Sequence, residues 1–124
     1  MTEDTKLIIS NGTMQQSLIS IASESWRFSR VFERLVMKLD AGEKSRYQSQ
    51  LRWFTKKVDE ALAQVELRIV NVEGHPFDPG MAATPLNIEE FKPEDSLVVD
   101  QMLEPIIMDK NGLVKSGTVI LRKL

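Results

Sequence analysis

The positions of the prolines divide this chain into two parts that cannot share one kind of structure. No proline precedes Pro76, and all five prolines lie between Pro76 and Pro105. Proline lacks an amide hydrogen and fixes its own φ angle, so it interrupts the interior of a helix. Long helices are therefore expected only before about residue 70, and shorter elements after it.

Two segments of the proline-free part have helical periodicity, 14–39 and 43–68. Apolar or small residues recur in them every three or four positions, as on one face of a helix. These residues are Leu18, Ala22, Ser25, Phe28, Phe32, Leu35 and Leu39, and then Tyr47, Leu51, Phe54, Val58, either Ala61 or Leu62, and Val65. Thr13 is the expected N-cap, and Gly42 the expected left-handed C-cap of the first helix. We predict an antiparallel helical hairpin over 13–68, preceded by a flexible N-terminus over 1–12.

A hairpin of two helices buries little apolar surface by itself. We therefore expect two copies of the chain to form a homodimer through a four-helix bundle. The expected dimer interface consists of Leu18, Phe28, Phe32, Leu35, Leu39, Leu51, Phe54, Val58 and Leu62. Trp26 and Trp53 are expected in the core of this bundle.

The remainder, 69–124, has the alternation and the β-branched residues typical of strands. Strands are expected at 67–70, 96–103, 106–108, 113–114 and 118–121, and no element is assigned to 80–94. Asp109-Lys110-Asn111-Gly112 is a strong turn signal. The predicted fold class is α+β, with an N-terminal helical hairpin and a small C-terminal β-domain.

Composition excludes several classes of function. The chain has no cysteine and one histidine, which rules out disulfides, thiolate nucleophiles and metal sites built from several histidines. The net charge of −2 is unlike that of a dedicated nucleic-acid binder. No apolar run reaches the length of a membrane span, and the N-terminus lacks a basic region typical of a signal peptide. We expect a cytoplasmic protein that is not an enzyme, with no cofactor, metal, membrane or nucleic-acid partner.

One segment carries a family resemblance. A Val/Ile-rich stretch, 65–72, runs into Gly74 and then Phe77-Asp78-Pro79, and Val114 to Leu121 follows a short turn near the C-terminus. This order resembles the GrpE family, the nucleotide exchange factors of DnaK-type chaperones. The resemblance implies a homodimeric cochaperone whose β-domain binds the chaperone's ATPase domain and promotes ADP release, without chemistry of its own.

The chain departs from that family at three places. Ala82 stands where family members usually have His, Glu104-Pro105-Ile106 stands in place of a K-G-Y turn, and Lys115 replaces an arginine. The family's long N-terminal coiled coil is also missing from the predicted elements. These differences leave an alternative open, namely a GrpE-fold adaptor or scaffold that binds a protein partner without exchange activity.

The resemblance implies partner-binding residues in the β-domain, namely Phe77, Asp78, Pro79, Met108 and Lys115. Each has an ordinary structural interpretation as well. Phe77 and Met108 fit a core position, Asp78-Pro79 fits a turn, and Lys115 fits a solvated strand position.

A basic stripe on the first helix has two interpretations. Arg27, Arg30, Arg34 and Lys38 recur every three or four residues and so share one face. They form either the solvated face of an amphipathic helix or a patch for an acidic partner or nucleic acid. The acidic residues of the second part show no spacing that would organise them for catalysis, so a small enzyme is the weakest alternative.

Overall fold

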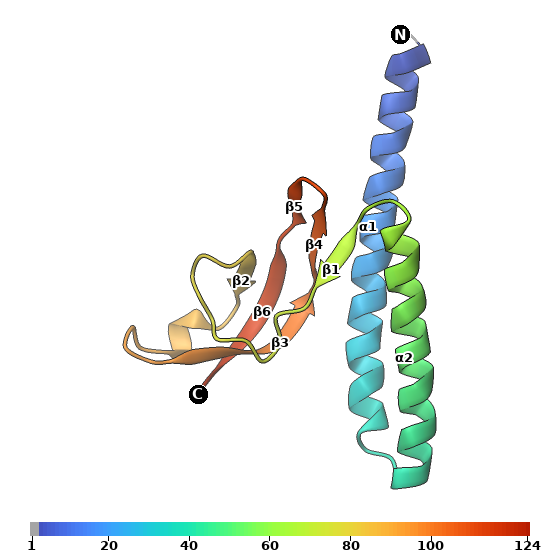
Figure 1. Cartoon of the computed structure of the whole chain (residues 1–124). Coiled ribbons are helices and arrows are strands. Elements are labelled where there is room, and N and C mark those ends of the chain that lie inside the picture. The colour runs from blue at the N-terminus through green and yellow to red at the C-terminus, as the bar shows by residue number, and fades with distance from the viewer. Residues whose placement is uncertain (1–2) are drawn as a thin grey trace.

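The computed structural model describes residues 3–124, with side chains from Gly12 onward, as a helical hairpin beside a small β-domain (Figure 1). The helices are α1 (Glu3–Val36) and α2 (Ala41–Ala63), and a short 3-10 helix, η1, spans Ile88–Glu90. The strands are β1 (Arg68–Val70), β2 (Ala83–Pro85), β3 (Leu97–Glu104), β4 (Ile106–Asp109), β5 (Gly112–Lys115) and β6 (Gly117–Lys123). The predicted α+β class is confirmed.

Helix α1 begins earlier than its expected cap. It starts at Glu3, so Thr13 lies inside the helix and does not cap it. Gly12 is tolerated because an isolated glycine costs a helix only about 1 kcal/mol relative to alanine. The region expected as a separate flexible N-terminus, 1–12, is therefore helical from Glu3 on, and residues 1–2 lie outside the described residues.

The connection between the helices also differs from the prediction. Helix α1 ends at Val36, so Gly42 lies too far along the chain to cap its C-terminus. Asp40 caps the N-terminus of α2. The Asp40 carboxylate accepts a hydrogen bond from the Glu43 amide at 3.0 Å, as an N-cap of α2 does. Gly42 lies in the first turn of α2 and is not a left-handed C-cap.

Helix α2 stops at Ala63, short of the expected end at residue 68. Glu66 adopts a left-handed conformation with φ of 62°, and the Leu67 amide donates to the Leu62 carbonyl at 3.0 Å. This is the Schellman pattern that closes many helices, with glutamate where glycine is usual. The turn directs the chain out of the hairpin and buries Leu67.

The β-domain contains two three-stranded sheets, with orders β1-β4-β5 and β2-β6-β3. The first is antiparallel, with Ile69 opposite Ile107, and in the second β6 pairs parallel with β2 and antiparallel with β3. β3 and β4 belong to different sheets and are joined by the fully buried Pro105. The segment Glu104-Pro105-Ile106, which stands in place of the K-G-Y turn, therefore connects the two sheets. Strand β2 was not predicted, and the parallel pairing that forms it is non-local.

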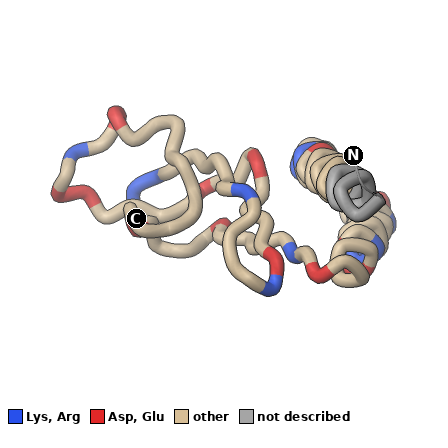
Figure 2. Tube along the Cα trace, turned by 90° about the horizontal axis from the view of Figure 1, so that it is seen from above, with Lys and Arg blue, Asp and Glu red and all other residues tan. Residues whose placement is uncertain are grey.

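Two apolar clusters hold the molecule together. One fills the β-domain with residues such as Val99, Met102 and Val119, and Trp26 of α1 belongs to it. The other joins both helices to the sheet β1-β4-β5, through Ile19, Ala22, Leu62, Leu67 and Ile107. Seen along the hairpin, the β-domain extends to one side of the two helices, which leaves their other faces uncovered (Figure 2).

Candidate protein–protein interface

An apolar stripe lies exposed along α1. It consists of Met14, Ile21, Phe28 and Leu35, whose exposed fractions are 60%, 64%, 64% and 58%. These residues follow one another at a strict spacing of seven positions. A seven-residue apolar repeat keeps one seam of a helix facing a partner helix in a left-handed coiled coil. We call this surface the α1 stripe.

A shallow groove lies beside the stripe, where α1 and α2 meet. Its walls are Phe28, Phe32, Leu51 and Phe54, and its volume is about 200 Å³. The rings of Phe28 and Phe32 stack with centroids 6.2 Å apart, and Phe32 meets Tyr47 edge-on at 6.3 Å. The hairpin thus presents packed aromatic side chains on a face where Phe28 and Phe54 remain exposed.

The structure divides the expected dimer residues into two groups. Six of them are exposed or half-buried and lie in the part of the hairpin nearer the turn between α1 and α2, namely Phe28, Phe32, Leu35, Leu39, Leu51 and Phe54. Leu62 is 4% exposed and packs with Ile107 inside its own chain, so its assignment to the dimer interface is wrong. Leu18 and Val58 pack partly against the same internal cluster. The dimer itself stays a prediction.

The two tryptophans have different environments, and neither lies in the core of the hairpin. Trp26 is buried against the β-domain, where it joins Met102 and Val119. Trp53 is 59% exposed, with the Lys57 ammonium group 4.5 Å from its ring centroid. The expectation that Trp26 lies in the bundle core is therefore wrong, since it packs against the β-domain of its own chain. For Trp53 the expectation stays a prediction, because it depends on the dimer.

A hydrogen-bonded junction fixes the β-domain to α1. The Trp26 indole Nε1 donates to the Met102 carbonyl at 2.6 Å. Glu73 accepts from the Met102 amide at 2.8 Å through one carboxylate oxygen and pairs with Arg30 at 2.6 Å through the other. The Arg30 guanidinium also lies 4.6 Å from the Trp26 ring centroid. We call Trp26, Arg30, Glu73 and Met102 the junction cluster.

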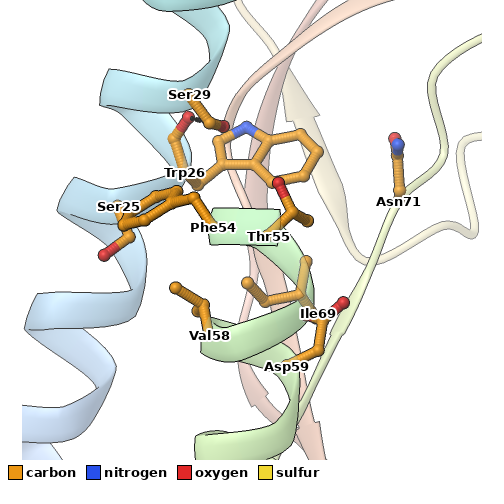
Figure 3. Close-up of a pocket in the computed structure, with 9 residues that line it drawn as sticks. All are labelled: Ser25, Trp26, Ser29, Phe54, Thr55, Val58, Asp59, Ile69 and Asn71. Carbon is orange, nitrogen blue, oxygen red and sulfur yellow. Dashed lines mark hydrogen bonds between the residues drawn. The ribbon is translucent and has the colours of Figure 1, made fainter. Parts of the chain in front are cut away.

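A small cavity of about 180 Å³ opens between the hairpin and β1 (Figure 3). The apolar side chains of Trp26, Phe54, Val58 and Ile69 converge on it from α1, α2 and β1. Asp59 lies at its edge, and burial raises the pKa of that carboxyl group. Because Phe54 also lines the aromatic groove, the cavity and the groove follow the same seam between the helices.

The predicted partner-binding residues of the β-domain lie in two places. Phe77, Asp78 and Pro79 form a loop beside β3, where the Phe77 amide donates to the Leu97 carbonyl. Phe77 is half-buried against the β-domain core, whereas Asp78 and Pro79 are exposed. The Asp78 carboxylate accepts from the Gly80 amide at 2.9 Å, which holds the loop in a turn.

Met108 and Lys115 lie in the other sheet. Met108 is half-buried and packs against the β-domain core. Lys115 is the last residue of β5, the strand before the last one. Its ammonium group lies 3.2 Å from the Glu104 carboxylate and 3.4 Å from the Ser23 hydroxyl of α1. The structure therefore gives this lysine internal partners.

Sequence reasoning missed Ile21, Met14 and the junction cluster. The sequence does contain the signal for the α1 stripe, since Met14, Ile21, Phe28 and Leu35 are spaced by seven residues. It was missed because the search for apolar residues three or four positions apart selects a neighbouring face of the helix. The junction cluster joins residues from α1, the loop after β1 and β3, and no local pattern brings these together.

Three further observations concern metal sites, membrane spans and similarity to known proteins. Among the residues whose side chains are described, no group of His, Asp and Glu is arranged to hold a metal ion. Within the same part of the chain, no helix combines the length and hydropathy needed to cross a membrane. Comparison with known protein families, with curated proteins and with solved structures finds no match.

Proposed function

We propose that this chain is a GrpE-like cochaperone, a homodimer that binds the ATPase domain of a DnaK-type chaperone and promotes ADP release. The observation that carries the proposal is the junction cluster. It fixes the β-domain to the same helix that presents the α1 stripe. A protein that holds a partner's nucleotide cleft open needs its β-domain at a defined position relative to its helices. A β-domain that moved freely would bind the open and closed forms of the cleft with similar affinity.

The mechanism requires only differential binding. The β-domain binds the open, nucleotide-free form of the ATPase domain more tightly than the closed form, and so shifts the chaperone toward the open form. Dimerisation through the α1 stripe and the aromatic groove would place two β-domains on one scaffold. The exposed Asp78 and Pro79 are the predicted contact residues whose side chains are most accessible.

The decisive experiment measures release of a fluorescent ADP analogue from a DnaK-type chaperone of the same organism. We expect this protein to accelerate release, and we expect Glu73→Gln to reduce the acceleration more than it reduces binding. The substitution removes the carboxylate that joins Arg30 to the Met102 amide. Glu60→Gln, on the exposed face of α2, is the matched control.

The alternative is an adaptor with the same architecture and no exchange activity. Lys115 favours it, because its ammonium group is already engaged by Glu104 and Ser23. The resemblance implies a contact residue at this position. Stable binding to the chaperone without faster ADP release would identify the adaptor, and absence of any binding would exclude both functions for that chaperone.

A further inference from the structure

A groove on the β-domain side of α1 has three arginines on one wall. Arg27, Arg30 and Arg34 face Leu86, Leu103 and Thr118 across a volume of about 310 Å³, and Glu104 completes the lining. The arginines come from one helix face, and the opposite wall comes from β3, β6 and the residue that follows β2. We call this the arginine groove.

The positive charge of the groove is only partly neutralised within the chain. Glu104 is engaged by Lys115 and by the Thr118 hydroxyl at 2.9 Å. Arg30 pairs with Glu73 and Glu33, yet its Nε is buried and has no hydrogen-bond acceptor among the described residues.

The two outer arginines have fewer internal partners still. Arg27 makes one long, exposed pair with Glu24 at 3.8 Å, and its charge contributes weakly to lowering the pKa of the Glu104 carboxyl group. Arg34 makes no ion pair within the part of the chain whose side chains are described. Two guanidinium groups are therefore available to an incoming anion, one at each side of Arg30.

Two leucines, Leu86 and Leu103, lie on the opposite wall beside Thr118 and Glu104. Leu86 is 52% exposed and Leu103 is half-buried, so an occupant that covers this wall needs apolar groups as well as negative charge. Arg27 and Arg34 are seven residues apart on the helix, which is about 10 Å along its axis. An extended peptide in the polyproline II conformation has three residues per turn and rises about 3.1 Å per residue, so carboxylates three residues apart lie on one side and about 9 Å apart, close to this separation.

We propose that the arginine groove binds an extended acidic segment of a partner protein, with carboxylates at Arg27 and Arg34 and an apolar side chain against Leu86. This inference does not depend on the proposed exchange activity. A nucleic acid fits less well, because its continuous phosphates would approach the carboxylates of Glu24 and Glu33 on the same helix.

The test is fluorescence anisotropy of a short fluorescein-labelled peptide in which glutamate, glycine and leucine alternate, titrated with the full chain. We expect saturable binding that weakens about tenfold or more when glutamine replaces glutamate in the peptide, because hydrogen bonds to charged groups are the strong ones. The double variant Arg27→Glu/Arg34→Glu should lose binding to a similar extent. The variant Arg46→Glu/Arg52→Glu carries the same charge change on α2 and should bind as the unmodified chain does.

Three outcomes would overturn the proposal. The first is equal affinity for the glutamate and glutamine peptides, a comparison that needs no protein variant and so holds even if the double variant misfolds. The second is unchanged binding by a folded double variant, checked by circular dichroism. The third is tighter, arginine-dependent binding of a single-stranded oligonucleotide, which would assign the groove to nucleic acid.

Discussion

The hairpin and the β-domain differ in how completely each buries its apolar residues. In the β-domain Val99, Met102 and Val119 are fully buried in one cluster, and Ile107 is fully buried in the cluster that joins the domain to the helices. In the hairpin Ile21 and Phe28 are each 64% exposed, although they lie in the middle of α1. The β-domain completes its cores with helix residues, Trp26 in one cluster and Ile19, Ala22 and Leu62 in the other, whereas the hairpin leaves the α1 stripe exposed.

The strongest test of this contrast compares the two tryptophans. Trp26→Ala should lower the free energy of unfolding by about 3–5 kcal/mol, because it empties a core position and leaves the Met102 carbonyl without its donor. Trp53→Ala should cost less than about 1 kcal/mol, since that ring is exposed. Chemical denaturation of both variants measures the difference. Equal losses would show that Trp53 is buried in solution, as a dimer would bury it.

The second test breaks the α1 stripe. The double variant Ile21→Asp/Phe28→Asp should weaken self-association at least about a hundredfold, since each buried apolar side chain contributes about 1.5–3 kcal/mol. Analytical ultracentrifugation gives the dissociation constant. Leu113→Asp is the control, because Leu113 is 50% exposed but lies in the β-domain. A monomeric unmodified chain at high concentration would contradict the dimer.

The third test compares glycines of the two regions. A Cβ atom on Gly117 would lie 2.8 Å from Ile106 Cγ1 and 2.9 Å from the Glu104 carbonyl oxygen. Gly117→Ala should therefore destabilise the β-domain by about 1–3 kcal/mol. Gly12→Ala meets no atom within 4 Å and should stabilise α1 by up to about 1 kcal/mol. Thermal unfolding measures whether each variant is more or less stable than the unmodified chain. A Gly117→Ala variant of unchanged stability would argue against the close approach of Gly117 to Glu104 and Ile106.

The fourth test concerns the turn between the two regions. Glu66→Gly should stabilise the chain by about 0.5–1 kcal/mol, because glycine adopts the left-handed conformation of this position without steric cost. The exposed pair with Lys110 that it removes contributes little. Glu66→Ala removes the same pair and keeps the strain, so it separates the two effects. Equal stability of both variants would indicate that this backbone stores no strain.

The smallest effects are pH-dependent and opposite in sign. Burial raises the pKa of Asp59 in the hairpin, so its ionised form opposes folding, and Asp59→Asn should stabilise the chain at neutral pH but not below about pH 3.8. Hydrogen bonds from Thr118 and Lys115 lower the pKa of Glu104. Glu104→Gln should therefore destabilise the chain at neutral pH, and the difference should vanish as pH falls through the lowered pKa.

Stability measured against pH for both variants checks these signs. Urea denaturation between acidic and neutral pH, with the unmodified chain beside each variant, gives the two difference curves. Curves of the same sign would contradict the opposite environments of Asp59 and Glu104.

Much of the fold was predictable from local signals, and the errors lie where local signals end. The Asp109–Gly112 turn and the strands on either side were placed correctly, because their residues determine the turn directly. Strand β2 was missed because Ala83–Pro85 becomes a strand only by pairing with the distant β6. Leu62 was assigned to the dimer interface because its spacing matches Val58 and Leu51, although it meets Ile107.

The sequence by itself determined that two helices precede a group of strands, where most of the strands lie, and which helical residues share a face. Proline positions, periodicity and turn residues act over a few neighbours, so they can be read without knowing the rest of the chain. Only the tertiary structure decided which apolar face is covered. Periodicity states that Trp26 and Phe28 are helical, but not that Trp26 meets Met102 while Phe28 stays exposed. That choice depends on where the β-domain docks, which is a property of the whole chain.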